Sequence, residues 1–154
     1  MKDNFKLMEY DDEHILFGIL FVLGNRLQVI GDTFYEEITT KQWLVLIILE
    51  VMEEQPPTLN ELADAMGSSH QNVKQLVLKL ESKGYVEMLS DEHDRRKTRI
   101  KMSESCHKVF EKYKPMEMEF MERLYEGVDK EDLKGAVRTL LQLEENMINM
   151  RNRK

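Results

Sequence analysis

The sequence predicts a mainly α-helical protein with a small β-hairpin wing, namely a winged helix-turn-helix combined with a helical dimerisation domain. Three patterns indicate this: two short amphipathic stretches joined by a tight turn, two alternating stretches around a polar loop, and long apolar stripes near both ends. We divide the chain into an N-terminal dimerisation helix at residues 1–37, a winged helix-turn-helix domain at residues 38–102, and C-terminal dimerisation helices at residues 103–154. The 154 residues are 42% hydrophobic, which is enough for one folded core.

The first predicted helix runs from about Asp11 to Glu36 and carries a heptad-like apolar stripe. The stripe consists of Leu16, Leu20, Leu23, Leu27, Ile30 and Phe34. Ile15, Ile19 and Val22 widen it beyond the surface that one neighbouring helix covers. Contact with a partner chain would explain this width, and an ordinary core helix remains an alternative.

A second helix is predicted between the capping pair Thr39 and Gln42 and the double proline Pro56-Pro57. The segment from Trp43 to Leu49 is apolar nearly all round, which is typical of a buried helix. We expect this helix to support the two that follow, with Trp43 in the core.

Two short helices follow, separated by a three-residue turn. The first is opened by a capping box of Thr58 and Glu61, and its apolar stripe consists of Leu59, Leu62, Ala63 and Met66. The second is expected to open with Ser68 and Gln71 and to end at Gly84, because glycine permits a left-handed cap. Its stripe consists of Val73, Leu76, Val77 and Leu80. A turn of this length between two helices is typical of a helix-turn-helix.

The outward face of the second short helix carries side chains that can read DNA. Gln and Asn can pair with adenine, Lys reaches guanine or phosphate, and Leu78 can meet a thymine methyl group. A helix face that is merely solvated can have the same composition, so both interpretations stay open on these residues alone. The candidate DNA-binding residues of this helix are Ser69, His70, Gln71, Asn72, Lys74 and Gln75.

A β-hairpin is predicted from the alternating stretches Tyr85–Leu89 and Thr98–Met102, with a polar loop between them. Five cations and no acid occur from Arg95 to Lys101, although the net charge of the chain is −7. Cations gathered against the overall charge suit a wing that contacts phosphates. The candidate DNA-binding residues of the wing are Arg95, Arg96, Lys97 and Arg99.

The C-terminal third predicts two more helices. The stripe of the first consists of Cys106, Val109, Phe110, Tyr113, Phe120, Met121 and Leu124. Pro115 is expected to kink or split this helix, and Gly127 to end it. Asp129 should cap the last helix. The terminal helices carry more apolar surface than one small core requires, which indicates dimerisation.

The region from the first short helix to the end of the hairpin resembles the winged helix of the MarR family of bacterial transcription factors. The matching residues are Leu62-Ala63, the run Leu80-Glu81-Ser82-Lys83-Gly84-Tyr85-Val86, Asp91-x-x-Asp94-Arg95-Arg96, and Ile100-x-Met102-Ser103. These matches are ordered and correctly spaced. Cys106 is a departure, because the family commonly has Gly there.

The resemblance implies a homodimeric transcription regulator, usually a repressor, that binds double-stranded DNA at an imperfect palindrome. It implies that Arg96 enters the minor groove and that Asp94 braces the wing tip through a salt bridge. A solvated loop that contacts phosphate nonspecifically is the alternative. The resemblance also implies a small hydrophobic or phenolic effector, with a pocket lined by Phe17, Phe21 and Trp43, although such residues on helices usually belong to a core.

The sequence offers no pattern for catalysis or for a bound cofactor. His14, His70, His93 and His107 lack the spacing of a metal site, and no glycine-rich phosphate loop or nucleophile motif occurs. We therefore expect no enzyme activity, no cofactor and no metal. A metal-responsive regulator and a winged helix that binds a protein remain as alternatives.

Charge and cysteine usage bear on compartment and partners. Residues 1–37 contain eight acids and three bases, whereas residues 93–114 contain eight bases and three acids, so the acidic total does not oppose DNA binding.

The only cysteine, Cys106, is expected in the core, and the reactive N-terminal cysteine of redox-sensing members of the family does not occur here. The apolar run Leu44–Leu49 is far shorter than the roughly 20 residues of a membrane span, and no signal-peptide pattern opens the chain. We expect a cytoplasmic protein without membrane contact.

Overall fold

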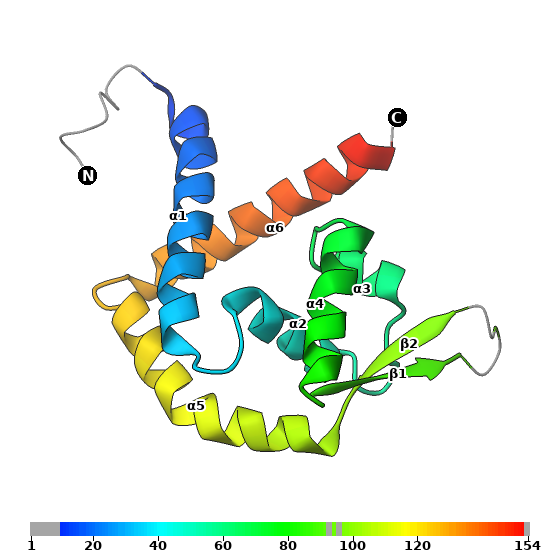
Figure 1. Ribbon diagram of the computed structural model, residues 1–154. Coiled ribbons are helices and arrows are strands. Elements are labelled where there is room, and N and C mark those ends of the chain that lie inside the picture. The colour runs from blue at the N-terminus through cyan, green and yellow to red at the C-terminus, as the bar shows by residue number, and fades with distance from the viewer. Residues whose placement is uncertain (1–9, 92–93, 95–96, 153–154) are drawn as a thin grey trace. The chain divides into compact units, whose positions relative to one another are not determined.

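The computed structural model describes residues 10–91, 94 and 97–152. Within these residues the fold is mainly helical with one β-hairpin, which confirms the predicted fold class (Figure 1). The elements are α1 (Asp12–Phe34), α2 (Thr40–Val51), α3 (Leu59–Ala65), α4 (His70–Ser82), β1 (Val86–Ser90), β2 (Thr98–Met102), α5 (Glu104–Leu124) and α6 (Lys130–Asn152). The chain divides into two compact units, residues 1–112 and 113–154, and the boundary falls inside α5.

The core of the first unit lies where α2, α3, α4 and the hairpin meet. Its buried side chains include Val45, Leu46, Leu49, Leu62, Ala63, Val73, Val77, Leu80, Val86 and Ile100. The stripes of α3 and α4 thus face inward as predicted. The expectation that α2 is buried on every side was wrong, since Leu44 is 45% exposed and Val51 is 81% exposed. The partners of α2 cover only part of its circumference.

Capping interactions fix where these helices begin. The predicted capping boxes of Thr39 with Gln42 and of Thr58 with Glu61 are both present. The predicted start of α4 was wrong by one residue: its N-cap is Ser69, whose Oγ accepts a hydrogen bond from the Asn72 amide at 3.3 Å.

The physical reason for that shift is the way in which α3 ends. Gly67 adopts the left-handed region with φ of 57°, and the amides of Gly67 and Ser68 donate to the Asp64 and Ala63 carbonyls, both at 3.0 Å. This pair of bonds is a Schellman motif. Because Ser68 closes the end of α3, the next residue caps α4.

A second Schellman motif ends α4 and shifts the hairpin. Gly84 has φ of 74°, as predicted for a left-handed cap, and the Tyr85 amide donates to the Leu80 carbonyl at 3.0 Å. Tyr85 therefore belongs to the helix end, and the first strand is Val86–Ser90 instead of Tyr85–Leu89. The strands are antiparallel, with Val86 opposite Met102 and Ser90 opposite Thr98.

The helices α1 and α2 meet through a close backbone approach. Thr40 Oγ1 donates to Asp32 Oδ1 at 2.8 Å, and the Thr40 amide donates to the same oxygen at 2.7 Å. A Cβ placed on Gly31 would lie 2.3 Å from Thr40 Oγ1. Glycine at this position is therefore required by the contact between the two helices.

The α5 helix continues through Pro115, so of the two expected outcomes, a kink or a split, the structure excludes the split, and the kink stays a prediction. Proline removes one backbone donor, but the neighbouring turns hold the helix together up to Leu124. In the second unit, Asp129 caps α6 as predicted, because its Oδ1 accepts from the Glu131 amide at 2.7 Å.

One described helix, α1, is long and apolar enough to cross a membrane by length and composition alone. The expectation of no membrane span rested on uninterrupted apolar runs, whereas this helix passes on length and mean hydropathy, which is weak evidence for a span. A soluble protein that covers such a helix with other protein surface passes the same test. The property by itself does not distinguish lipid from protein as the neighbour of α1.

Candidate nucleic-acid interface

The outward face of α4 presents the polar side chains that the sequence singled out. Ser69, His70, Gln71, Asn72, Lys74 and Gln75 are all exposed. On the opposite side, Val73, Val77 and Leu80 are buried in the core and fix the rotation of the helix about its axis. The first turn contains no acidic residue. The free face thus combines amide and hydroxyl groups with one cation at the positive end of a helix dipole.

The wing loop begins and ends with a compact turn organised by Asp91. This side chain is 5% exposed, and its Oδ1 accepts a hydrogen bond from the Asp94 amide at 2.8 Å. The Asp91 amide donates to the Lys97 carbonyl at 3.0 Å, and the Lys97 amide donates to the Asp94 carbonyl at 2.8 Å. Sequence analysis gave Asp91 no role, although an acid at the first position of a basic loop is a signal for such a turn.

Two of the predicted wing contacts, Arg95 and Arg96, lie outside the described residues, and so does the predicted salt bridge of Asp94 with the wing tip. Lys97 is exposed at the end of the loop.

Arg99 points back toward the body of the domain. Its Nε donates to Asp91 Oδ2, and its Nη1 donates to the Pro56 carbonyl at 2.6 Å. Glu61 Oε2 lies 3.9 Å from the same Nη1. Sequence analysis grouped Arg99 with the DNA-binding cations because a strand position does not reveal which residues of other segments are within reach.

The C-terminal end of α4 is held by a polar cluster around Glu37. The Glu37 carboxylate accepts from the Tyr85 hydroxyl and from Lys112 Nζ, the latter at 2.8 Å, and its carbonyl accepts from Lys83 Nζ. The hydrogen bond from Lys112, followed by that from Tyr85, lowers the pKa of Glu37 below its ordinary value. The cluster joins the segment between α1 and α2 to the end of α4 and the first half of α5.

The three predicted effector-pocket residues lie in different environments. Phe17 and Phe21 contact each other edge to face with ring centroids 5.1 Å apart, and they are 65% and 63% exposed. Trp43 is 6% exposed and packs on Tyr35 and Phe110, with centroid distances of 5.0 and 4.6 Å. A hydrophobic ligand would thus reach the phenylalanines directly and Trp43 only after movement of its neighbours.

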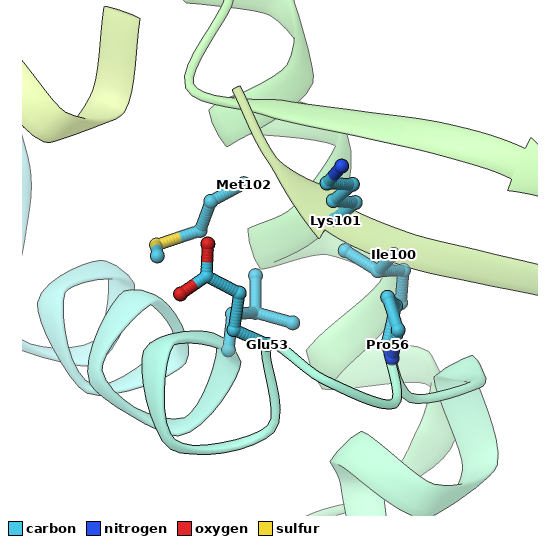
Figure 2. Close-up of a pocket in the computed structure, with 6 residues that line it drawn as sticks. Glu53, Pro56, Ile100, Lys101 and Met102 are labelled. Carbon is cyan, nitrogen blue, oxygen red and sulfur yellow. The ribbon is translucent and has the colours of Figure 1, made fainter. Parts of the chain in front are cut away.

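A shallow hollow lies elsewhere, at the base of the wing. Figure 2 shows Glu53, Pro56, Ile100, Lys101 and Met102 around it. It is too small to enclose a ligand. Its position shows that β2 packs closely on the end of α2 and on the connector that follows.

Cys106 is fully buried, and its Sγ lies 3.9 Å from Met102 Sδ. Burial raises the pKa of the Cys106 thiol to about 11, with Glu50 adding to the shift. A thiol in this environment behaves as a small core group, as predicted. Among the described residues, no group of three or more His, Cys, Asp or Glu side chains is placed to hold a metal ion.

A helix-turn-helix with an exposed polar second helix, followed directly by a hairpin with a basic loop, defines a winged helix-turn-helix protein. Residues 37–97 match the model of the MarR family. Over this segment the chain is similar to the MarR family of transcription regulators.

Three relatives illustrate the similarity. The chain is 28% identical over 102 residues to the transcriptional repressor MprA of Escherichia coli K12. The aligned segment covers 64% of this chain and 58% of the length of the repressor. The structure of the S. aureus MepR–DNA complex matches with a TM-score of 0.70 and 19% identity, covering 90% of this chain and 99% of MepR. Bordetella bronchiseptica BpsR, whose DNA binding is regulated by 6-hydroxynicotinic acid, matches with a TM-score of 0.73 and 17% identity, covering 87% and 96%. At these identities the two structures show a shared fold.

Proposed function

We propose that the protein is a sequence-specific DNA-binding transcriptional regulator that acts as a homodimeric repressor in the cytoplasm. The observation that carries this proposal is the exposed polar face of α4, fixed on a buried apolar stripe and followed at once by a cation-rich wing. In this account Ser69, His70, Gln71, Asn72, Lys74 and Gln75 enter a major groove. Arg95, Arg96 and Lys97 contact the backbone and the adjacent minor groove, where A·T-rich sequence concentrates negative potential.

The proposed dimer rests on apolar surface that each unit leaves exposed. Gly31 is the only buried residue among those of α1, and Leu23, Val29 and Ile30 are 47%, 68% and 50% exposed. In the second unit, Leu141 and Ile148 of α6 are 59% and 53% exposed. Soluble proteins rarely leave long apolar stripes uncovered. A second copy of the chain is the partner we assign to these helices, and the similarity to the MarR family favours it over lipid.

A two-fold dimer would place two α4 helices in successive major grooves on one side of the duplex. Their separation must then be about 34 Å, one helical turn of B-DNA. The operator is accordingly an inverted repeat.

A titration of random-sequence duplex DNA at rising salt tests DNA binding. Affinity should fall steeply between about 50 and 200 mM salt, and Lys74→Ala should reduce the slope by about 1, because it removes one phosphate or groove contact. Lys41→Ala, which removes an exposed cation from α2 outside the proposed interface, is the matched control. A flat salt dependence of the wild type would indicate a protein-binding winged helix instead.

We further propose that a small hydrophobic or phenolic effector lowers DNA affinity, in analogy with the regulation of BpsR by 6-hydroxynicotinic acid. Trp43 is the only tryptophan, so its fluorescence reports on the aromatic cluster with Tyr35 and Phe110. A ligand that releases DNA should change this fluorescence, and Phe17→Ala should weaken the effect if the exposed phenylalanines bind the ligand.

A further inference from the structure

We propose that Arg99 is a positioning residue that locks the wing to the helix-turn-helix and thereby sets DNA affinity without contacting DNA. This inference rests on the proposed DNA-binding function and reassigns one cation of the wing. The remaining candidates of the wing, Arg95, Arg96 and Lys97, keep their proposed contacts.

Arg99 joins three segments that are distant in sequence. Through Nε it bonds Asp91 at the start of the wing loop, and through Nη1 it bonds the Pro56 carbonyl in the connector between α2 and α3 at 2.6 Å. Glu61, which accepts from the Thr58 amide at 2.7 Å and so caps α3, lies 3.9 Å from the same Nη1. The planar guanidinium can serve several acceptors at fixed angles, which an ammonium group cannot do.

The backbone supports the same joint. Arg99 forms an isolated antiparallel bridge with Thr58, and the neighbouring Ile100 amide donates to the Pro57 carbonyl at 2.9 Å. The hairpin is therefore hydrogen-bonded to the residues that open α3. The Arg99 side chain extends this backbone connection to the wing loop.

Asp91 carries the connection onward into the loop. Its Oδ2 accepts a hydrogen bond from the Arg99 guanidinium, and its Oδ1 accepts one from the Asp94 amide. The side chain of Asp91 is 5% exposed, so its charge is poorly solvated and the Arg99 guanidinium helps to compensate it. The position of the wing loop thus depends on a buried carboxylate and on a half-buried guanidinium that bonds to it.

The competing interpretation is that Arg99 contacts a DNA phosphate directly. Two substitutions distinguish this interpretation from the positioning role. Lysine keeps the positive charge but has one donor nitrogen in place of the Nε and Nη1 that bond Asp91 and Pro56. Arg99→Lys should therefore weaken DNA binding on the order of tenfold, the size of coupling within a hydrogen-bonded network. Asp91→Asn should also weaken binding, because the brace is lost. If Arg99 bound phosphate, Asp91→Asn would remove a nearby negative charge and strengthen binding.

The experiment measures DNA affinity of the full-length wild type, Arg99→Lys, Asp91→Asn and the double variant at one salt concentration. Lys101→Gln is the control, since it removes an exposed cation from the same strand. We expect both single variants to bind more weakly than this control, and the double variant to be no weaker than the worse single variant. Wild-type affinity of Arg99→Lys, or tighter binding by Asp91→Asn, would overturn the proposal.

Hydrogen exchange on the DNA-free proteins provides a readout that does not depend on DNA binding. The amides of Asp94, Lys97 and Ile100 should exchange faster in Arg99→Lys than in the wild type, while amides of the α4 core turns should stay protected. If the wild type bound no DNA, the proposed function would fail, yet this measurement would still report the brace. Unchanged exchange at all three amides would refute the brace itself.

Discussion

The winged helix-turn-helix and the terminal helices use apolar residues in opposite ways. Between α2 and β2, the apolar stripes meet one another, and Val45, Leu46, Leu62 and Leu80 have no exposed surface. Along α1 and α6 the stripes are as regular but remain open to solvent within one chain. One region completes its core within a single chain, whereas the other leaves apolar side chains exposed, which we assign to contact with a second copy.

The difference predicts unequal effects of the same substitution. Leu80→Ala should lower the free energy of unfolding by about 2–5 kcal/mol, because it opens a cavity in a closed core. Leu141→Ala, on the exposed stripe of α6, should instead raise the dissociation constant of the dimer. Chemical unfolding and sedimentation equilibrium of both variants measure the two quantities. The account would be contradicted if both variants lost the same unfolding free energy and Leu141→Ala left the dissociation constant of the dimer unchanged.

The contact between α1 and α2 can be tested with two glycines of the same helix. Gly31→Ala should destabilise the protein by about 1–3 kcal/mol, because its Cβ would collide with Thr40. Gly24→Ala is the matched control, since a Cβ there meets nothing within 4 Å, and it should stabilise by about 0.5–1 kcal/mol through reduced chain entropy. Thermal melts of both variants at equal concentration give the comparison, and a neutral Gly31→Ala would show that α1 is not held against α2.

The start of α4 offers a smaller effect. Ser69→Ala should cost about 1 kcal/mol of stability, because it removes the acceptor for the Asn72 amide. Ser68→Ala changes the adjacent residue, whose backbone closes α3, and should be nearly neutral. Urea unfolding measures both variants. An equal loss of unfolding free energy in Ser69→Ala and Ser68→Ala would show that Ser69 is not the N-cap of α4.

Ionisation of the Cys106 thiol should have the smallest effect on stability at neutral pH. With its pKa raised from 9.0 to about 11, the buried thiol contributes stability that is fully present below pH 9 and is lost as the pH rises through 11. Alkylation at pH 8 should be about a hundredfold slower in the native than in the unfolded protein, by thiolate fraction alone. Mass spectrometry after timed alkylation measures this, and rapid labelling of the native state would contradict the burial.

The fold was largely predictable because local signals coincide with tertiary packing in the winged helix. The stripes of α3 and α4, the boxes at Thr39 and Thr58, and the left-handed Gly84 are all encoded within a few residues. The errors at the starts of α4 and β1 have one cause: overlapping motifs compete for the same residue. Ser68 and Tyr85 each belong to a Schellman motif, so the next element starts one residue later than its own pattern indicates.

The candidate site was predictable in composition but not in role. The exposed face of α4 follows from helix periodicity alone, and the structure leaves those side chains free to face solvent. The inward turn of Arg99 depends on Pro56, Asp91 and Glu61, which come close only when the hairpin packs on the connector. Contacts of this kind are not contained in any local pattern.

Selection of bound duplexes from a random-sequence pool tests the central claim most directly. A homodimer that inserts two α4 helices predicts an enriched inverted repeat with half-site centres about 10 base pairs apart. Recovery of an unrepeated site, or no enrichment over the starting pool, would contradict the account.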